Sequence, residues 1–169
     1  SVPNLITGFR LLLIPVFVGV YFKGLYGWAL ACLAVSGLSD VADGFIARHY
    51  NMITDLGKLM DPVADKLLVL TAMIMLTEKG LLPAWAVVIV AARELLVDGL
   101  RLVASGSGKV VAAKLPGKVK TVLQLCCVLS ALILQTHPVT LALTVAMSIM
   151  TVVSGAVYFK GLWKYVCEP

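Results

Sequence analysis

The segment from residue 40 to residue 65, DVADGFIARHYNMITDLGKLMDPVAD, decides how this chain must fold. Four of its five aspartates stand at helical spacings, with Asp40 and Asp43 three residues apart and Asp61 and Asp65 four apart. Residues separated by three or four positions share one face of an α-helix. The segment therefore predicts two consecutive helices, each with a pair of carboxylates on one face.

The rest of the chain is strongly apolar. Hydrophobic residues make up 60% of the 169 residues, charged residues only 14%, and the mean hydropathy is +0.99. A soluble domain of this size would expose more charge to water. We predict an all-α integral membrane protein in which residues 1–169 form one domain. The net charge of +5 is spread over helix ends and loops, so we expect membrane topology and no nucleic-acid partner.

Six apolar stretches are long enough to cross a membrane, which takes about 20 residues. They cover approximately residues 5–22, 26–47, 56–76, 83–104, 119–134 and 139–159. If the N-terminus is cytoplasmic, the outer loops contain only Lys23 and Lys79, and the inner segments carry most of the other cations. We expect a bundle of six transmembrane helices in a plasma (inner) membrane, with the N-terminus on the cytoplasmic side.

Most of the acidic residues lie where lipid would be expected. Six of the nine fall in the second, third and fourth stretches: Asp40, Asp43, Asp61, Asp65, Glu94 and Asp98. An ionised carboxylate at membrane depth is unfavourable unless it is paired or faces water. The short link between the second and third stretches brings the four aspartates toward one polar cavity open to the cytoplasm. Four such charges repel one another, and hard divalent ions relieve this because they prefer carboxylate oxygen. We predict two ions, Mg²⁺ or Mn²⁺, able to polarise a phosphoryl group.

Small residues accompany the aspartates. Gly44, Ala47 and Gly57 would let a ligand approach the helix backbone closely. Small residues are also common where membrane helices pack against each other, so both interpretations stay open.

These residues together form a known pattern. The spacing of Asp40, Asp43, Gly44, Ala47, Arg48, Gly57, Asp61 and Asp65 resembles the signature of the CDP-alcohol phosphotransferase family, with all eight fixed positions filled. The resemblance implies that Asp40, Asp43 and Asp61 bind the metal ions. It implies that Asp65 contributes to the metal site and acts as the general base. It also implies a cytidine diphosphate pocket lined by Gly44, Ala47, Arg48 and Gly57, CDP-diacylglycerol as the donor, and a homodimer.

The N-terminal segment is similar to the part of the family that helps hold the nucleotide. Its residues Asn4, Thr7 and Arg10 are therefore expected to bind the CDP-lipid. Asn4 and Thr7 could instead cap a helix at the interface, and Arg10 could extend its charge toward water.

The second half of the chain carries cations that suggest a phosphorylated acceptor. They are Arg93, Arg101, Lys114, Lys118 and Lys120, and this region resembles the phosphatidylglycerophosphate synthase branch of the family, whose acceptor is glycerol 3-phosphate. A second phosphate beside an acidic site needs cations of its own, and guanidinium groups suit it. Alternatively, Arg93 pairs with Glu94 or Asp98, and the lysines only set the topology.

Other functions remain open at this point. Inositol phosphate or phosphatidylglycerol could replace glycerol 3-phosphate as the acceptor without changing the metal site. Intramembrane acids also mark ion pathways, so a metal-ion transporter is the alternative from another class. A transporter of that kind would be expected to show repeated halves, and the sequence has no internal repeat.

Overall fold

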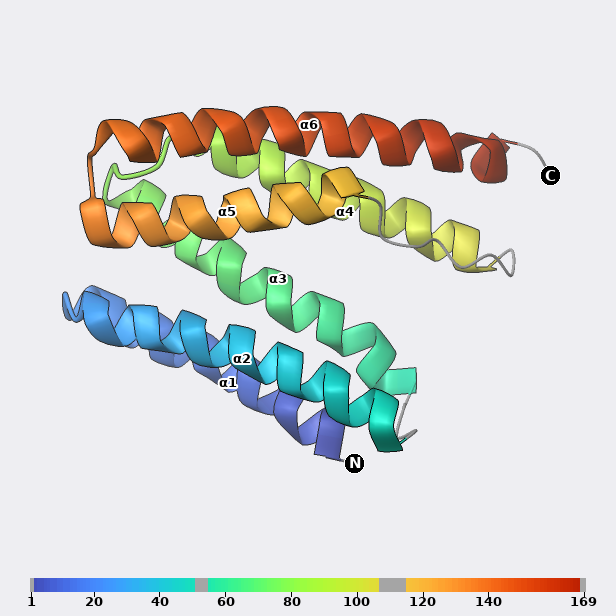
Figure 1. Ribbon diagram of the computed structural model, residues 1–169, viewed down its shortest axis with the longest axis horizontal. Helices are drawn as coiled ribbons and strands as arrows, with labels where there is room; N and C mark the ends of the chain where they lie inside the picture. Colours follow the sequence, from blue (N-terminus) through green and yellow to red (C-terminus); the bar gives the residue numbers. More distant parts are fainter. Residues whose placement is uncertain (1, 51–54, 107–114, 168–169) are drawn as a thin grey trace. The chain divides into compact units, whose positions relative to one another are not determined.

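Every regular element in the described part of the computed structural model is an α-helix (Figure 1). The structure describes the backbone of residues 2–50, 55–106 and 115–167, and the side chains of residues 5–39, 63–64, 66–106 and 115–163. The helices are α1 (Val2–Phe22), α2 (Tyr26–Tyr50), α3 (Asp55–Glu78), α4 (Ala84–Gly106), α5 (Leu115–Leu134) and α6 (Pro138–Cys167). The predicted all-α fold and the order of six helices are confirmed, and α6 runs eight residues further than expected.

Within the residues that the structure describes, three helices are long and apolar enough to cross a membrane. The segments are Leu5–Phe22 in α1, Leu115–Leu134 in α5 and Pro138–Trp163 in α6. In α2 the described side chains form a shorter apolar segment, Tyr26–Ser39. The chain is a membrane protein of helices, and the crossing of all six remains a prediction.

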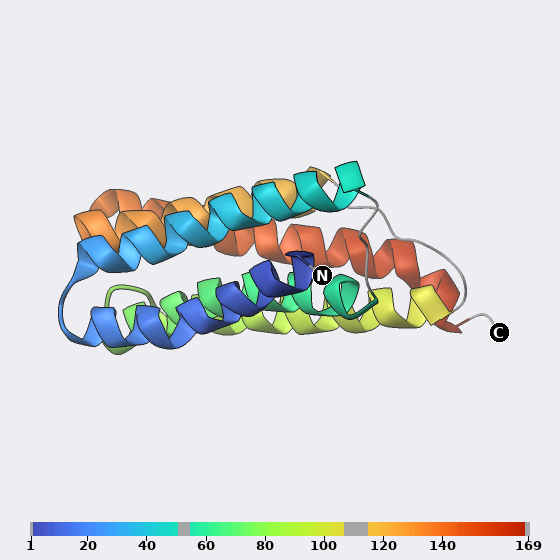
Figure 2. The ribbon, with the colours of Figure 1, turned by 90° about the horizontal axis from the view of Figure 1, so that it is seen from below.

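The helices form two compact units, Ser1–Glu78 and Lys79–Pro169. In the first unit α1 packs against both α2 and α3, which also touch each other over a smaller area. Figures 1 and 2 both show α2 and α3 running in opposite directions. In the second unit α6 packs against α4 on one side and α5 on another. Each unit therefore consists of three helices, one of which packs against the other two: α1 in the first unit and α6 in the second.

Glycine ends the first helix of the first unit. Gly24 has a φ of 71°, and its amide donates to the carbonyl of Tyr21 at 2.9 Å, while the amide of Leu25 reaches back to Val20 at 3.0 Å. These two bonds form a Schellman motif, which satisfies carbonyls at the helix end. Near this end the buried hydroxyl of Tyr21 donates to the carbonyl of Met75 at 3.2 Å and ties α1 to α3.

Apolar and hydroxyl side chains hold the second unit together. Buried Val97 and Ala104 of α4 pack with Tyr158 and Leu162 of α6. Between α5 and α6, the Ser130 and Thr140 hydroxyls lie 2.7 Å apart. In lipid a polar group must find a partner within the protein, and such bonds contribute on the order of 0.6 kcal/mol each. The contacts between α4, α5 and α6 position the polar cluster described below.

Candidate functional site

The aspartate segment lies on two helices of the first unit, as predicted. Asp40 and Asp43 belong to α2, and Asp61 and Asp65 belong to α3. The helical backbone confirms that each pair occupies one helical face. The side chains of all four, and those of Gly44, Ala47, Arg48 and Gly57, lie outside the side chains that the structure describes. Their convergence on one cavity therefore stays a prediction.

The backbone nevertheless places the two pairs at matching heights. Asp40 lies ten residues before the end of α2, and Asp65 lies ten residues after the start of α3. Asp43 and Asp61 lie seven and six residues from the same two ends. At a rise of 1.5 Å per residue these distances are about 15 Å and about 10 Å. Because α2 and α3 are antiparallel and only residues 51–54 separate them, Asp40 lies at a height similar to that of Asp65, and Asp43 at a height similar to that of Asp61.

Four carboxylates on two touching helices are a suitable donor set for divalent ions. Mg²⁺ takes carboxylate oxygens and keeps other positions for water or phosphate. In two-metal sites the ions lie about 3.5–4 Å apart. Carboxylates from two neighbouring helices can supply ligands to both ions. The donor chemistry therefore fits the predicted metal pair.

Two of the predicted nucleotide-binding residues lie inside the first unit. Thr7 is 3% exposed and Arg10 is 0% exposed, one turn apart on α1. A guanidinium that reached out to water would not be fully buried, so the structure disfavours the alternative of an interfacial Arg10. Because α1 contacts both aspartate helices, Thr7 and Arg10 lie on the element that joins them. The side chain of Asn4 lies outside the described part.

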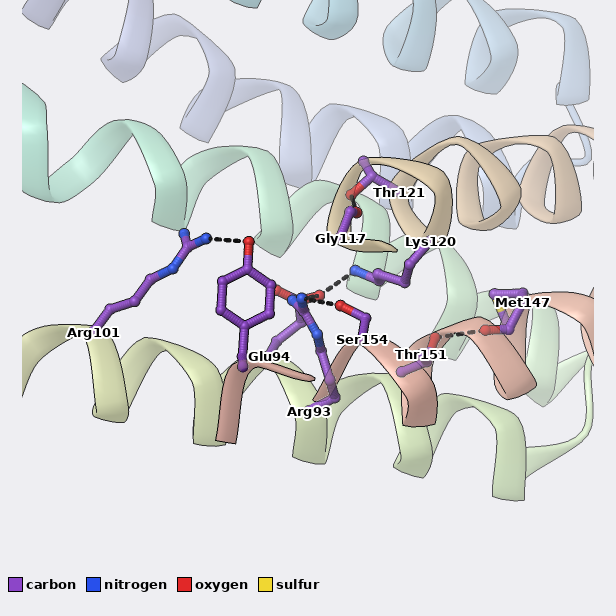
Figure 3. A network of polar contacts seen from close by, with 10 residues as sticks. Arg93, Glu94, Arg101, Gly117, Lys120, Thr121, Met147, Thr151 and Ser154 are labelled. Atoms are coloured by element: carbon purple, nitrogen blue, oxygen red, sulfur yellow. Dashed lines mark hydrogen bonds and ion pairs between the residues drawn. The ribbon is translucent and has the colours of Figure 1, made fainter. Parts of the chain in front are cut away.

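The second unit contains a cluster of cations around one tyrosine, which we call the cationic cluster. Its cations are Arg93 and Arg101 of α4 and Lys120 of α5 (Figure 3). The ring of Tyr158 of α6 lies beside both arginines. Three of the five predicted acceptor-binding cations therefore meet in space. Lys118 is exposed, and Lys114 lies outside the described residues.

Arg93 is fixed from three sides. Its side chain is 10% exposed, and its Nη2 donates to the Ser154 hydroxyl at 2.6 Å. Its Nη1 lies 3.2 Å from Oε1 of Glu94, and its guanidinium carbon lies 5.3 Å from the centroid of the Tyr158 ring. The predicted alternative pairing with Glu94 thus exists alongside the other contacts. Nε of Arg93 is buried without a hydrogen-bond partner, so this arginine still has a donor to offer.

Arg101 contacts the same tyrosine. Its Nη2 donates to the Tyr158 hydroxyl at 3.0 Å, and its guanidinium carbon lies 4.9 Å from the ring centroid. Nε of Arg101 is also buried without a partner. Cation–π contacts of this kind contribute about 0.5–2 kcal/mol each. Tyr158 therefore orients two guanidinium groups at once.

Lys120 joins the cluster through a carboxylate. Its side chain is 4% exposed and its ammonium group donates to Oε1 of Glu94, the oxygen that Arg93 also contacts. Lys118 precedes it by two residues, which is more than half a turn of helix, so both lysines cannot face the cluster. The burial of Lys120 and the exposure of Lys118 follow from this geometry.

Two glycines make room for the stacked side chains. A Cβ atom on Gly117 would lie 3.2 Å from the ring and hydroxyl of Tyr158 and 3.4 Å from Nη2 of Arg93. A Cβ on Gly155 would lie 3.3 Å from Cγ of Arg93. The backbone of α5 and α6 therefore borders the cluster directly.

Sequence reasoning missed Tyr158, Ser154 and the role of Gly117. A tyrosine or serine within an apolar stretch looks like any packing residue. The available signal was weak: Ser154 and Tyr158 are four residues apart on α6, with a small residue between them on the same face. With these groups, the cluster holds three cations, of which Arg93 and Lys120 contact the Glu94 carboxylate, and such a set suits a small, multiply charged anion.

Comparison with known proteins places the chain in a family. Residues 1–156 match the family model described as CDP-alcohol phosphatidyltransferase. The chain is 40% identical to the CDP-diacylglycerol–glycerol-3-phosphate 3-phosphatidyltransferase of Bacillus subtilis, over 97% of this chain and 96% of that protein. A probable phosphatidylglycerophosphate synthase of Mycobacterium tuberculosis is 34% identical over 94% of this chain and 79% of its own length. A cardiolipin synthase (CMP-forming) of Streptomyces coelicolor is 38% identical over 57% of this chain and 48% of its own length.

These matches confirm the resemblance seen in the sequence and exclude the transporter alternative. The family model extends across both units and includes the aspartate helices and the three cations of the cationic cluster, and it ends at residue 156, two residues before Tyr158. The aspartate segment and most of the second unit thus fall within one matched region, and the chain belongs to the CDP-alcohol phosphatidyltransferase family.

Proposed function

We propose that the chain transfers a phosphatidyl group from CDP-diacylglycerol to glycerol 3-phosphate, giving phosphatidylglycerophosphate and CMP. The relative from Bacillus subtilis carries the name of this reaction and aligns over nearly the whole chain. Family membership supports the donor, and the second unit supports the acceptor.

The cationic cluster is the observation that carries the choice of acceptor. Glycerol 3-phosphate brings a phosphate monoester that carries nearly two negative charges at neutral pH. Arg93 and Arg101 each keep a buried Nε without a partner, and Lys120 lies close to Arg93 through Glu94. Guanidinium groups bind phosphate oxygens with directional, charge-assisted hydrogen bonds. A neutral alcohol such as serine or inositol would leave these cations without use.

The acceptor phosphate would rest on the arginines and on Lys120. Lys118 and Lys114 lie just before Lys120 in the sequence, and we assign them a supporting role as positive charge near the site. Tyr158 and Ser154 hold the two arginines and leave their remaining donors available.

The aspartate segment would hold the donor side of the reaction. Members of this family generally depend on a divalent metal. We assign Asp40, Asp43, Asp61 and Asp65 to two Mg²⁺ or Mn²⁺ ions. Bound there, such ions would polarise the phosphoryl oxygens and neutralise charge on the leaving CMP.

Asp65 would also act as the general base. Its carboxylate takes the proton of the acceptor hydroxyl as the oxygen attacks the phosphorus that carries the diacylglycerol. The bond from that phosphorus to the oxygen of CMP breaks, and CMP leaves.

The remaining positions of the family signature would hold the nucleotide and its diphosphate. Gly44, Ala47 and Gly57 would let the ligand approach α2 and α3 closely, and Arg48 would pair with a phosphate oxygen. From α1, Thr7 and Arg10 would reach the same ligand, together with Asn4. The burial of Thr7 and Arg10 supports a role inside the protein.

We further propose the setting in which the enzyme works. All six helices would cross a plasma (inner) membrane, with the N-terminus and a polar cavity on the cytoplasmic side, where soluble glycerol 3-phosphate is available. The two units would act together as one catalytic domain, since one family model covers both. Two copies would associate as a homodimer.

One specific observation favours a second acceptor. The relative named cardiolipin synthase is 38% identical over a little more than half of this chain, so phosphatidylglycerol is the strongest competitor, ahead of inositol phosphate. Its phosphate is a diester with a single charge, which uses fewer cations than the cluster provides.

The test is CMP release by purified protein in detergent, given CDP-diacylglycerol, Mg²⁺ and one acceptor at a time. Glycerol 3-phosphate, inositol phosphate, serine and phosphatidylglycerol would be compared, with Asp65→Asn as the blank. Metal-dependent release with glycerol 3-phosphate alone, absent in the blank, is the expected result. Release with phosphatidylglycerol but not glycerol 3-phosphate would overturn the acceptor, and release with none would overturn the reaction.

A further inference from the structure

Glu94 is the buried acid that the proposed reaction does not use. Its side chain is 5% exposed and lies in the middle of α4, where a carboxylate is unfavourable without partners. It accepts from Arg93 of its own helix and from Lys120 of α5 on the same oxygen. Adjacent residues on a helix do not normally face each other. The Arg93 side chain must therefore turn back toward Glu94, so this contact is a specific feature of the cluster.

We propose that Glu94 is the internal counter-ion of the cationic cluster, a positioning residue that lowers its charge by one and holds Arg93 and Lys120 ready for a phosphate. The inference rests on the proposed function, since it assumes that the cluster receives the phosphate of the acceptor. Glu94 does not touch the acceptor. It acts through the two cations that it binds.

Two consequences follow from this arrangement. Without an anion, Arg93 and Lys120 would repel each other, and Glu94 keeps them close. With Glu94 present, the cluster attracts anions less strongly than three bare cations would. A cluster that bound phosphate too tightly would release the phosphorylated product slowly. It would also be blocked by inorganic phosphate. Glu94 therefore lowers the affinity of the cluster for phosphate, keeps Arg93 and Lys120 in place, and allows faster turnover.

The substitution Glu94→Gln separates charge from shape. The amide oxygen can still accept from both cations, but the negative charge is gone. The Glu94 carboxylate and a bound phosphate carry like charges that repel each other, so we expect inorganic phosphate to bind roughly tenfold more tightly once that charge is removed. Maximal turnover should fall because the product leaves more slowly, and the KM for glycerol 3-phosphate should fall with it.

The experiment uses full-length protein in detergent with Mg²⁺ and has two readouts. The first is the rise in melting temperature caused by inorganic phosphate, which needs no turnover. The second is inhibition of CMP release by phosphate. Glu78→Gln is the matched control. The substitution removes the same charge, but Glu78 is exposed at the end of α3 in the other unit. It should leave both readouts unchanged.

A larger phosphate-induced rise and stronger inhibition in Glu94→Gln alone support the proposal. An equal or smaller phosphate response in Glu94→Gln overturns it and leaves Glu94 a structural ion-pair partner. If Glu94→Gln does not fold, Glu94→Asp keeps the charge and should bind phosphate as the unaltered protein does, with an unchanged KM for glycerol 3-phosphate; tighter phosphate binding there contradicts the proposal. Absence of turnover in the unaltered protein would overturn the proposed function, while the melting readout would still test the role of Glu94.

Discussion

Replacing Tyr158 with phenylalanine removes one oxygen atom and should weaken acceptor binding. The hydroxyl accepts from Nη2 of Arg101 at 3.0 Å, whereas the ring, which contacts both Arg93 and Arg101, remains. A hydrogen bond to a charged group contributes about 1.5–3 kcal/mol. Arg101 is half-buried, so we take the lower end, which corresponds to roughly a tenfold rise in the KM for glycerol 3-phosphate.

Replacing Tyr158 with leucine should have a larger effect because the ring is lost as well. Each of the two cation–π contacts adds about 0.5–2 kcal/mol, and the two arginines would lose their common surface. The assay is steady-state CMP release with each substrate varied in turn. The KM for CDP-diacylglycerol should stay near its original value, since the donor is assigned to the first unit.

Phe159→Leu is the matched control, because Phe159 is the next residue on α6 and is 45% exposed. It should change neither KM. The reasoning is refuted if Tyr158→Leu, folded by circular dichroism, binds glycerol 3-phosphate as well as the unaltered protein. It is equally refuted if the two Tyr158 variants raise the KM for CDP-diacylglycerol instead.

Three other perturbations test separate parts of the structure. Gly117→Ala puts a methyl group 3.2 Å from Tyr158, which costs about 1–3 kcal/mol and should raise the acceptor KM several-fold, whereas Gly99→Ala, with nothing within 4 Å, should not. Asp61→Asn should lower turnover by roughly a hundredfold or more and raise the Mg²⁺ concentration needed for half-maximal activity. Chelation of the metal should stop CMP release by the unaltered enzyme, while its helical circular dichroism stays the same. Ser130→Ala breaks the 2.7 Å contact with Thr140 and should lower stability in detergent by about 0.6 kcal/mol without altering either KM.

The six helices could be predicted because apolar runs and their interruptions are local features. Gly24 and Gly80 lie in the gaps between predicted stretches, and there the backbone takes positive φ values of 71° and 72°. The end of α6 was predicted eight residues too early. The apolar run is interrupted at Lys160 and Gly161, but the helix continues through both residues to Cys167. Helical spacing likewise gave the aspartate pairs, which need no knowledge of tertiary contacts.

The cationic cluster could be predicted only in part. Charged residues in an apolar stretch are conspicuous, so Arg93, Arg101 and Lys120 were identified. Their partners were not, because Tyr158 lies 57 residues beyond Arg101 and meets it only through the packing of α4 on α6. Ser154 was hidden for a different reason: hydroxyls in membrane helices usually bond to their own helix, as Thr151 does with the carbonyl of Met147 at 2.7 Å.

The measurement that tests the account most directly compares glycerol 3-phosphate with glycerol as acceptors, in the unaltered protein and in Arg101→Gln. The two acceptors differ only in the phosphate, which we assign to the cationic cluster. We predict a much higher kcat/KM for glycerol 3-phosphate, and a ratio that falls roughly tenfold or more in Arg101→Gln while the rate with glycerol is unchanged. An unchanged ratio, or an equal loss with both acceptors, would show that the phosphate binds elsewhere and would contradict the account.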